Sequence, residues 1–268
     1  MLNPIFEPKL GRPKDLALSA LLPRYRRKVQ LSRLPIEKQI VLPYLLLSDD
    51  AKLAFVKNSK AGCTSVAHLI HQYSKGYEYS GNIHKDSKEL QQGLLFWKEN
   101  LQIIQTRSPY LFSFVRHPEK RIVSAFLNFF TDRTNPTGKK HFVAMNAFGF
   151  RQDEDIQQNF GVFLNYIQAS VDRDIHQTDR HWRPQYINLG IPNFQYDHIG
   201  KLENFEAEIE FIFRAAGIVD FNLGTLDTRA RNSTQPNHLQ VSVEHKKQIA
   251  AIYHEDYRLF DYSADADR

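Results

Sequence analysis

The stretch LAFVKNSKAGCTSVAHLIHQ, residues 53 to 72, constrains the fold of this chain more than any other part of it. The segment KLAFVK (52 to 57) has the length and apolar content of a short buried strand, and CTSVAHLIHQY (63 to 73) repeats apolar residues at helical spacing. The turn between them carries small and basic residues: Lys57, Lys60, Gly62, Thr64 and Ser65. Because a helix N-terminus presents amide hydrogens and a partial positive charge, this turn predicts a site for a small anion.

A second transition from strand to helix follows in YLFSFV (110 to 115) and RHPEKRIVSAFLNFF (116 to 130). Pro118 suits the first turn of that helix, where the missing amide hydrogen of proline costs nothing. Arg116 stands at the end of the strand and offers a forked donor to a phosphate. Ser124, two turns along, can add a hydroxyl if the phosphate lies against that helix. Two separate anion sites indicate a ligand with two phosphate-bearing ends.

Two strand-to-helix units predict an α/β fold, in which a parallel sheet is flanked by helices. Weaker patterns extend this prediction: GVFLNYIQAS as a helix, YDHIGKLENF as a strand running into the helix EAEIEFIFRAAG, and SVEHKKQIAAIYHEDYRLF as a closing helix. Residues 131 to 155 are rich in turn-forming residues, so we expect a connection without regular structure there. Long loops of compact domains commonly contact substrates, which makes this segment a candidate lid over an acceptor.

The composition allows a packed core, because 42% of the 268 residues are hydrophobic and 12% are aromatic. The first fifty residues are rich in proline and arginine, and we expect residues 1–50 to form an arm that packs on a single domain of residues 51–268. The net charge of +5 and the isoelectric point near 9.1 favour an acidic partner. They do not choose among a nucleotide, a nucleic acid, an anionic glycan and a lipid headgroup. We interpret RYRRK (24 to 28) as a solvated basic face rather than a nucleic-acid contact.

Cysteine content and hydropathy indicate the compartment. Cys63 is the only cysteine, so the chain forms no internal disulfide and fits a reducing compartment. No run approaches the ~18 apolar residues of a membrane span, and the start MLNPIFEPKLGRPKDL lacks the charged-then-apolar order of a signal peptide. We therefore expect a cytoplasmic protein, of a bacterial kind, without a transmembrane segment.

Other classes of function remain open at this point. The turn after the first strand is not a Walker A motif, because Lys60 precedes Gly62 instead of following a second glycine, so an ordinary kinase is disfavoured. An atypical P-loop kinase would bind ATP with magnesium. A non-catalytic protein that binds anionic glycans is the other alternative. No RNP, KH or zinc-finger pattern is present, and no nucleic-acid partner is predicted.

Five segments resemble one family. SKAGCTS (59 to 65) resembles the 5′-phosphosulfate-binding loop of the sulfotransferases, and FVRHPEKRIVSAF (114 to 126) resembles their 3′-phosphate-binding segment, written V-R-[DE]-P-x-x-R-x-x-S. DRHWRPQY (179 to 186), YDHIGKLENF (196 to 205) and YHEDYRLFDY (253 to 262) match further signatures in the same order. These signatures resemble in particular the carbohydrate sulfotransferases of the HNK-1, chondroitin and dermatan type, which form sulfotransferase family 2.

The resemblance implies a sulfotransferase fold with a P-loop-like sheet and the donor 3′-phosphoadenosine-5′-phosphosulfate, which leaves as adenosine 3′,5′-bisphosphate. No metal is expected. Lys60 would contact the bridging oxygen, and the residues around the 5′-phosphate would be Ala61, Gly62, Cys63, Thr64 and Ser65. Arg116 and Ser124 would hold the 3′-phosphate. Lys57 lies outside the matched loop and is a secondary candidate for substrate binding.

Two departures from the family pattern stand out. His117 replaces the usual acidic residue after Arg116, which removes a negative charge beside a phosphate site. The paired cysteines of the family fall here at Gly190 and Asn193, in agreement with a protein that meets no oxidising lumen.

The reaction implied is in-line attack of an acceptor hydroxyl on the sulfuryl sulfur, with positioning and charge neutralisation doing most of the catalysis. The hydroxyl proton needs a base, and a neutral imidazole suits that role. His84 is the first choice because related enzymes carry a histidine near that place, and His181 in RHWRPQ is the second. Glu203 is an alternative base.

The expected acceptor is a sugar hydroxyl on a possibly anionic chain, although a lipid or small metabolite stays open. Candidate acceptor contacts are His141 in the long connection, Arg183 and Lys201. The segment RNSTQ (231 to 235) resembles a short family segment near the nucleotide.

Overall fold

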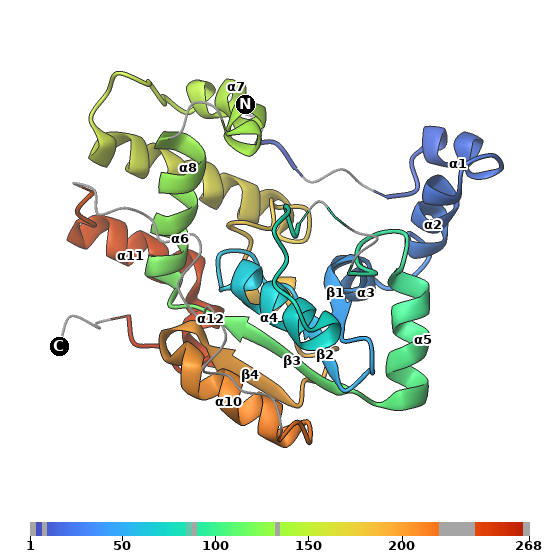
Figure 1. Cartoon of the computed structure of the whole chain (residues 1–268). Coiled ribbons are helices and arrows are strands. Elements are labelled where there is room, and N and C mark those ends of the chain that lie inside the picture. Colours follow the sequence, from blue (N-terminus) through green and yellow to red (C-terminus); the bar gives the residue numbers. More distant parts are fainter. Residues whose placement is uncertain are drawn as a thin grey trace. The chain divides into compact units, whose positions relative to one another are not determined.

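The computed structural model describes residues 4–6, 10–84, 86, 90–131, 135–219 and 239–264 (Figure 1). The chain folds into two compact units. Unit 1 comprises Met1–Pro8, Arg116–Ile187 and Ser233–Arg268, and unit 2 comprises Lys9–Val115 and Asn188–Asn232. The predicted division into an arm and a single domain at residue 50 stays a prediction. Within the described ranges, no helix has the length and apolar character needed to cross a bilayer.

Unit 2 is built on a sheet of four strands in the order β1 (Leu45–Leu47), β2 (Leu53–Val56), β3 (Tyr110–Val115) and β4 (His198–Lys201). The short first strand runs antiparallel to β2, whereas β2, β3 and β4 are parallel to one another. Val56 pairs with Ser113, and Val115 pairs with Lys201. The carboxyl ends of the three parallel strands therefore share one edge, which is where ligands bind in sheets of this kind. The predicted α/β fold with a parallel sheet is confirmed.

Helices α4 (Cys63–Lys75) and α10 (Phe205–Ala215) of unit 2 bury their apolar residues in one core with the sheet. Their rings meet where Tyr73 lies edge-on to Phe213, with centroids 5.6 Å apart. Each large side chain buried in this way contributes about 1.5–3 kcal/mol. In the described residues of the unit, the other helical elements are α1 (Pro13–Ser19), α2 (Pro23–Leu31), α3 (Ile36–Val41), α5 (Trp97–Arg107) and the 3-10 turns η1 (Leu42–Tyr44) and η3 (Leu202–Asn204).

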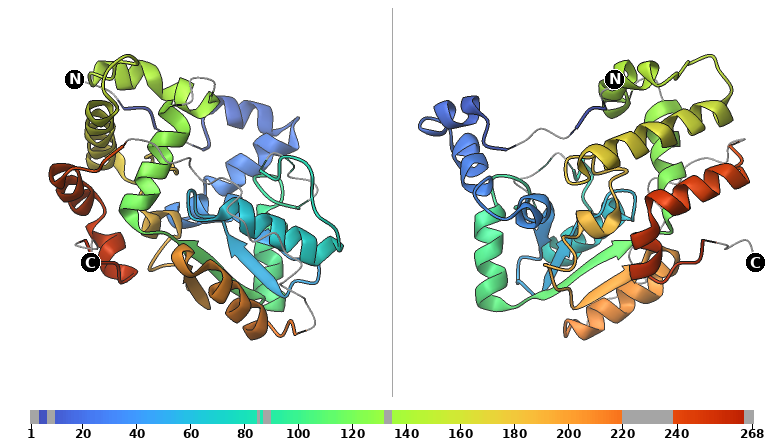
Figure 2. Two further views of the ribbon diagram at one scale, coloured as in Figure 1. Left: turned by 60° about the vertical axis from the view of Figure 1, so that its left-hand side comes forward. Right: turned by 180° about the vertical axis from the view of Figure 1, so that it is seen from behind.

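Unit 1 is helical in its described residues. Its elements are α6 (Pro118–Phe126), the π-helical turn η2 (Leu127–Thr131), α7 (Pro136–Ala147), α8 (Ile156–Asp174), α9 (Gln185–Asn188, ending in unit 2), α11 (Val243–Ile252) and α12 (His254–Leu259). An aromatic core surrounds the fully buried Trp182, whose ring lies 5.4 Å from that of Phe163 and 6.1 Å from that of Phe130. Helix α8 runs alongside α11, as Figure 2 shows.

The strands and helices predicted from the two strand-to-helix units are confirmed, and so are the helices within 161–170 and 206–217. The expectation of an irregular connection at 131–155 was wrong for its centre, where α7 forms. The turn-type residues lie at the start of α7, and the following Ala144 and Met145 are buried in the core of unit 1.

The predicted closing helix is interrupted by Tyr253, which has φ −110° and separates α11 from α12. At this break the Tyr253 hydroxyl donates to the carbonyl of Trp182 at 2.6 Å.

Candidate active site

The loop of residues 57–62 joins β2 to α4 at the carboxyl edge of the sheet, and Asn58 fixes its course. The Asn58 side chain is fully buried; it donates to the carbonyl of Phe114 at 3.0 Å and accepts from the Asn188 amide at 3.1 Å. The backbone amide of Ala61 donates to the Asn58 carbonyl at 3.3 Å and closes the turn. A buried polar side chain with these bonds anchors the loop to β3.

Two residues of this loop have left-handed backbone conformations, Lys60 with φ 66° and Gly62 with φ 75°. Only glycine adopts this region without cost, and a non-glycine residue there stores local strain of the kind seen at binding sites. A Cβ atom at position 62 would lie 2.7 Å from Cδ1 of Leu202, so the space beside Gly62 also requires glycine.

Gly62 is the N-cap of α4 and has no side chain to cap the first turn. The amides of Cys63, Thr64 and Ser65 lie outside the hydrogen-bond ladder of the helix, as in every helix N-terminus. The 13 residues of α4 give a substantial dipole whose positive end is at this point. Lys60 adds a cationic side chain in the same loop. This arrangement fits an anion of phosphate size.

The segment before α5 folds onto the loop and brings His84 to it. Nε2 of His84 lies 2.8 Å from Oγ1 of Thr64. Lys57 is 7% exposed, and its ammonium donates to Oε1 of Gln92 at 2.6 Å. The Gln92 amide in turn donates to the carbonyl of Ile83 at 2.7 Å. The structure thus brings Lys57 and His84 together with the helix N-terminus in unit 2.

Lys201 is the last residue of β4 and pairs with Val115 at the same edge of the sheet. Its backbone amide donates to Oε1 of Glu208 at 3.1 Å. Glu203 is exposed in the 3-10 turn η3 (Leu202–Asn204), and the neighbouring Leu202 is the residue that packs beside Gly62. Lys201 and Glu203 therefore belong to the surroundings of the loop.

In unit 1, the side chain of Gln185 forms two hydrogen bonds with the backbone of Arg116. The Arg116 amide donates to Oε1 of Gln185 at 3.0 Å, and Nε2 of Gln185 donates to the Arg116 carbonyl at 2.8 Å. Gln185 is fully buried. Its own backbone amide and that of Tyr186 donate to the two carboxylate oxygens of Asp256, at 2.8 and 3.0 Å. These contacts form a chain of support from Asp256 through Gln185 to Arg116.

Asp256, at the base of these contacts, and the nearby Arg121 are both buried. Burial raises the pKa of Asp256 to about 6, although the amides of Gln185 and Tyr186 and the positive charge of Arg121 oppose the rise. The guanidinium of Arg121, 1% exposed, donates to the carbonyl of Arg180 at 3.1 Å. Ser124, 6% exposed, lies one turn further along α6. Arg116 lies two residues before α6 and Ser124 is the seventh residue of that helix, and the expectation that both bind one anion stays a prediction.

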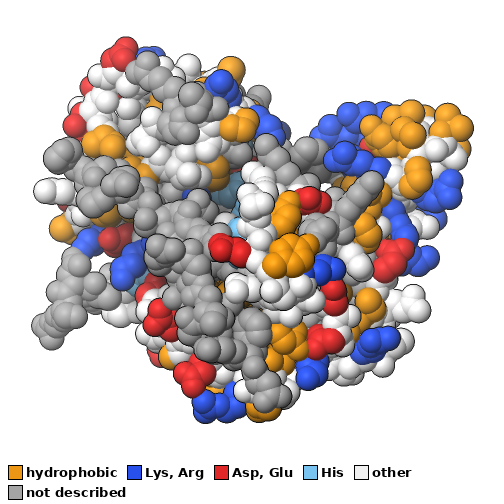
Figure 3. Space-filling view, viewed as in Figure 1, with side chains coloured by type: hydrophobic (Ala, Val, Ile, Leu, Met, Phe, Trp, Pro, Cys, Tyr) orange, Lys and Arg blue, Asp and Glu red, His pale blue; other side chains and the backbone are white. Residues whose placement is uncertain are grey.

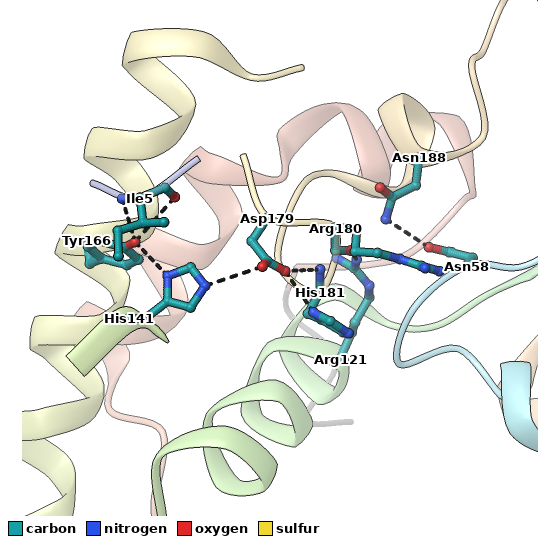
Figure 4. A network of polar contacts seen from close by, with 9 residues as sticks. All are labelled: Ile5, Asn58, Arg121, His141, Tyr166, Asp179, Arg180, His181 and Asn188. Atoms are coloured by element: carbon teal, nitrogen blue, oxygen red, sulfur yellow. Dashed lines mark hydrogen bonds and ion pairs between the residues drawn. The ribbon is translucent and has the colours of Figure 1, made fainter. Parts of the chain in front are cut away.

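The two remaining histidine candidates meet at one carboxylate, that of Asp179 (Figure 4). Nδ1 of His181 lies 2.7 Å from Oδ1 of Asp179, and Nε2 of His141 lies 3.3 Å from Oδ2. His141 is 2% exposed, and the His181 side chain is 27% exposed. Burial alone would raise the pKa of Asp179, but the charge and hydrogen bonds of the two histidines hold it well below its usual value.

Arg183 lies inside unit 1, since it is 1% exposed and donates to the carbonyl of His176 at 2.7 Å. The predicted acceptor contacts of Arg183 and His141 stay predictions, and both side chains are buried. The segment 231–235 lies outside the described residues. In the part of the chain that the structure describes, no three His, Cys, Asp or Glu side chains gather in a way that could hold a metal ion.

Sequence reasoning missed the supporting residues of both units, namely Asn58, Asp179, Gln185 and Asp256. Three of them lie in segments that the sequence already singles out, DRHWRPQY and YHEDYRLFDY. Acidic and amide residues in such segments were a usable signal, because they commonly orient catalytic or binding groups. Asn58, within the loop itself, carried the same signal.

A parallel strand that runs through a left-handed loop into a helix N-terminus without a side-chain cap is an arrangement that binds phosphate groups in many α/β proteins. The Sulfotransferase family model matches residues 43–263, most of the chain, and the chain therefore belongs to the sulfotransferase family. The resemblance drawn from the five segments is confirmed.

Individual relatives agree with this assignment. The chain is similar to carbohydrate sulfotransferase 11 of Rattus norvegicus, with 25% identity over 245 residues that cover 83% of this chain and 68% of the relative. It is also similar to carbohydrate sulfotransferase 14 of Danio rerio, with 24% identity over 190 residues that cover 68% of this chain and 51% of the relative. No solved structure gives a significant match.

Proposed function

We propose that this protein transfers a sulfuryl group from 3′-phosphoadenosine-5′-phosphosulfate to a hydroxyl group of a carbohydrate. The observation that carries this proposal is the loop of residues 57–62, with left-handed Lys60 and Gly62 placed directly before the N-terminus of α4. Membership of the sulfotransferase family supports the chemistry. The printed names of the relatives, carbohydrate sulfotransferases 11 and 14, support the class of acceptor.

The residues of the loop fit the phosphosulfate end of such a donor. The absence of a Cβ at Gly62 lets the backbone amides of Cys63, Thr64 and Ser65 approach phosphate oxygens closely. The Lys60 ammonium supplies a positive charge for the bridging oxygen, where negative charge develops as the sulfuryl group departs. When bound, the donor supplies the activated sulfuryl group, and this chain supplies binding and charge stabilisation.

Arg116 and Ser124 of unit 1 would hold the 3′-phosphate. A guanidinium binds a phosphate through two parallel hydrogen bonds, so its value depends on how firmly its backbone is placed. The two hydrogen bonds between the Gln185 side chain and the Arg116 backbone hold that backbone in position. A site for the 3′-phosphate would favour this donor over nucleotides such as AMP or ATP, which lack a 3′-phosphate.

A general base takes the proton of the acceptor hydroxyl. His84 and His181 are the candidates, since each has a ring nitrogen held by a polar partner, Thr64 and Asp179 respectively. Lys201 at the edge of the sheet would attract an acidic acceptor chain, with Glu203 exposed beside it. A proton acceptor of this kind contributes about 10²–10⁴-fold to the rate.

The test is transfer of radiolabelled sulfate from the donor to desulfated polysaccharides such as unsulfated chondroitin. We expect the wild-type protein to label the polymer and Lys60→Ala to lose about 100-fold or more in kcat, the cost of one lost electrostatic donor. Lys98→Ala, at an exposed position of α5, is the matched control and should keep full activity. Equal activity of the Lys60 and Lys98 variants would refute the role given to the loop.

A further inference from the structure

Helices α1 and α2 form a helical pair in unit 2 (Figure 1), and one side of α2 attaches this pair to the rest of the unit. On that side Leu31 is buried in one cluster with Leu42 and with Trp97 of α5. The indole nitrogen of Trp97 donates to the Arg27 carbonyl at 3.3 Å, and the Arg27 guanidinium pairs with Glu99 of α5. Helix α2 is therefore held on α5, and α1 contacts α2.

Polar contacts within the pair fix the turn between the two helices. The Arg26 guanidinium donates to the carbonyls of Ser19 and Ala20, at 3.3 Å each, and so binds the C-terminal end of α1. A cation at this end of a helix also interacts favourably with the helix dipole. Asp15 of α1 is 1% exposed and lies 3.5 Å from the ammonium of Lys28 of α2. The backbone that presents the side chains of the turn is therefore well supported.

Three leucines of this pair are exposed. Leu16 of α1 is 53% exposed, and Leu21 and Leu22, in the turn between α1 and α2, are 79% and 45% exposed. All three lie outside the cluster around Trp97. In Figure 3 hydrophobic side chains gather over these helices with basic side chains beside them. A single exposed leucine is ordinary, whereas neighbouring exposed apolar side chains mark an interaction site.

The charge of the same region is positive. Residues 10–34 contain seven basic residues and one acidic residue, Asp15, which is buried. Four exposed basic residues lie at the N-terminal ends of the two helices: Arg12, Lys14, Arg24 and Arg26. The leucine–arginine surface, defined by these four residues and the three leucines, therefore combines apolar side chains with excess positive charge.

We infer that the leucine–arginine surface docks on an anionic lipid bilayer. Leu21 and Leu22, on the turn that joins the helices, enter the boundary between headgroups and acyl chains. The basic side chains then lie near the headgroups, where an anionic leaflet attracts each of them. Apolar entry and electrostatic attraction reinforce each other on one surface. This inference uses no residue of the proposed sulfuryl transfer and is independent of it.

The composition of the surface favours a bilayer over two other occupants. A polyanionic glycan or nucleic acid would use the basic residues and leave the three leucines in water. A second copy of the chain would bring the same basic residues of both copies together across a two-fold axis, and such contact between like charges is unfavourable. An anionic bilayer accommodates both the leucines and the positive charge.

The first test is sedimentation of the full chain with vesicles of phosphatidylcholine alone or mixed with phosphatidylglycerol. We expect binding to the mixed vesicles that weakens as the salt concentration rises, because salt screens the basic residues. Leu21→Ser/Leu22→Ser should weaken this binding about tenfold or more. Val143→Ser, at a side chain of α7 that is 80% exposed, is the matched control and should bind like the wild type.

Charge reversal tests the basic residues of the surface. Lys14 and Arg24 are each the second residue of their helix, where the helix dipole favours glutamate, so Lys14→Glu/Arg24→Glu should keep the fold. This variant should weaken binding to the mixed vesicles about tenfold or more. Lys139→Glu/Lys140→Glu, at two exposed lysines of α7, changes the net charge by the same amount and should lose less than about threefold.

A tryptophan placed in the turn reports its contact with lipid directly. The native Trp97 and Trp182 are 4% and 0% exposed and give a constant background. In Leu21→Trp we expect emission that moves to shorter wavelength with the mixed vesicles and is quenched by brominated acyl chains, since tryptophan settles at the bilayer interface. Val143→Trp should show neither change.

Three results would overturn the inference. The first is a wild-type protein that does not sediment with the mixed vesicles. The second is binding that survives the leucine changes, which identifies an electrostatic site for a polyanion. The third is a wild-type protein that dimerises in analytical ultracentrifugation and becomes monomeric in Leu21→Ser/Leu22→Ser, without vesicle binding by either; this result assigns the surface to contact between copies of the chain.

Discussion

Replacing Gln185 by leucine tests how the 3′-phosphate site is built. Leucine has nearly the volume of glutamine but makes neither the bond from the Arg116 amide at 3.0 Å nor the bond to the Arg116 carbonyl at 2.8 Å. Leaving two partly buried backbone groups unsatisfied costs roughly 1–3 kcal/mol each. Arg116 will relax to recover part of this cost, and its guanidinium then loses its fixed position.

We expect Gln185→Leu to weaken adenosine 3′,5′-bisphosphate binding about 30-fold, which corresponds to ~2 kcal/mol. AMP lacks the 3′-phosphate that Arg116 would bind, so its affinity should change less than about threefold. Titration calorimetry with both nucleotides measures the difference. Gln248→Leu, which removes one exposed bond to Asn165, is the control and should change neither affinity.

A general loss of folding would weaken the binding of both nucleotides to the same extent and would also lower the melting temperature. Equal weakening of the two affinities, or no change in either, would refute the claim that Gln185 acts through Arg116. Gln185→Glu should lie between wild type and Gln185→Leu, because one carboxylate oxygen still accepts from the Arg116 amide while the other faces the Arg116 carbonyl.

Three further predictions concern stability and the loop. Gly62→Ala should cost about 1–3 kcal/mol in chemical denaturation, since alanine is strained at φ 75° and its Cβ would lie 2.7 Å from Leu202; full stability would contradict the loop geometry. Burial raises the pKa of Asp256 from the usual 3.8 to about 6, so the native state binds this proton more tightly than the unfolded state does. The stabilisation that the protonated carboxyl group contributes should therefore fall by roughly 3 kcal/mol as the pH rises from 3.8 to 6. In Asp256→Asn this part of the pH dependence of stability should be missing. Asp155→Ala should cost about 1 kcal/mol, because the Asp155 carboxylate caps α8 through two amides, and an unchanged denaturation midpoint would contradict this.

The sheet and its helices were predictable from the sequence because their signals are local. An apolar run of strand length followed by residues at helical spacing defines β2 and α4, and the same holds for β3 and α6. The centre of 131–155 was misread because α7 begins among turn-type residues, and the packing of Met145 in the core of unit 1 decides its structure. Tertiary burial of this kind leaves a weak local signal.

The groups expected to contact a ligand were found from the sequence, whereas those that support them were not. Lys60 lies four residues after β2 and Arg116 directly after β3, and the positive charge of each can be recognised in the sequence. Gln185 and Asp179 act through other residues, across 69 positions of the chain for the pair of Gln185 and Arg116, and across 38 for Asp179 and His141. A spacing pattern carries no information on contacts of that range, so they required coordinates.

The most direct test of the account is calorimetric binding of adenosine 3′,5′-bisphosphate to the wild-type protein, Lys60→Ala and Arg116→Ala, with magnesium ATP as comparator. The account predicts micromolar binding of the bisphosphate that is weakened in Lys60→Ala, lost in Arg116→Ala and absent for ATP. Binding of magnesium ATP without binding of the bisphosphate would contradict it and identify the loop after β2 as that of an atypical kinase.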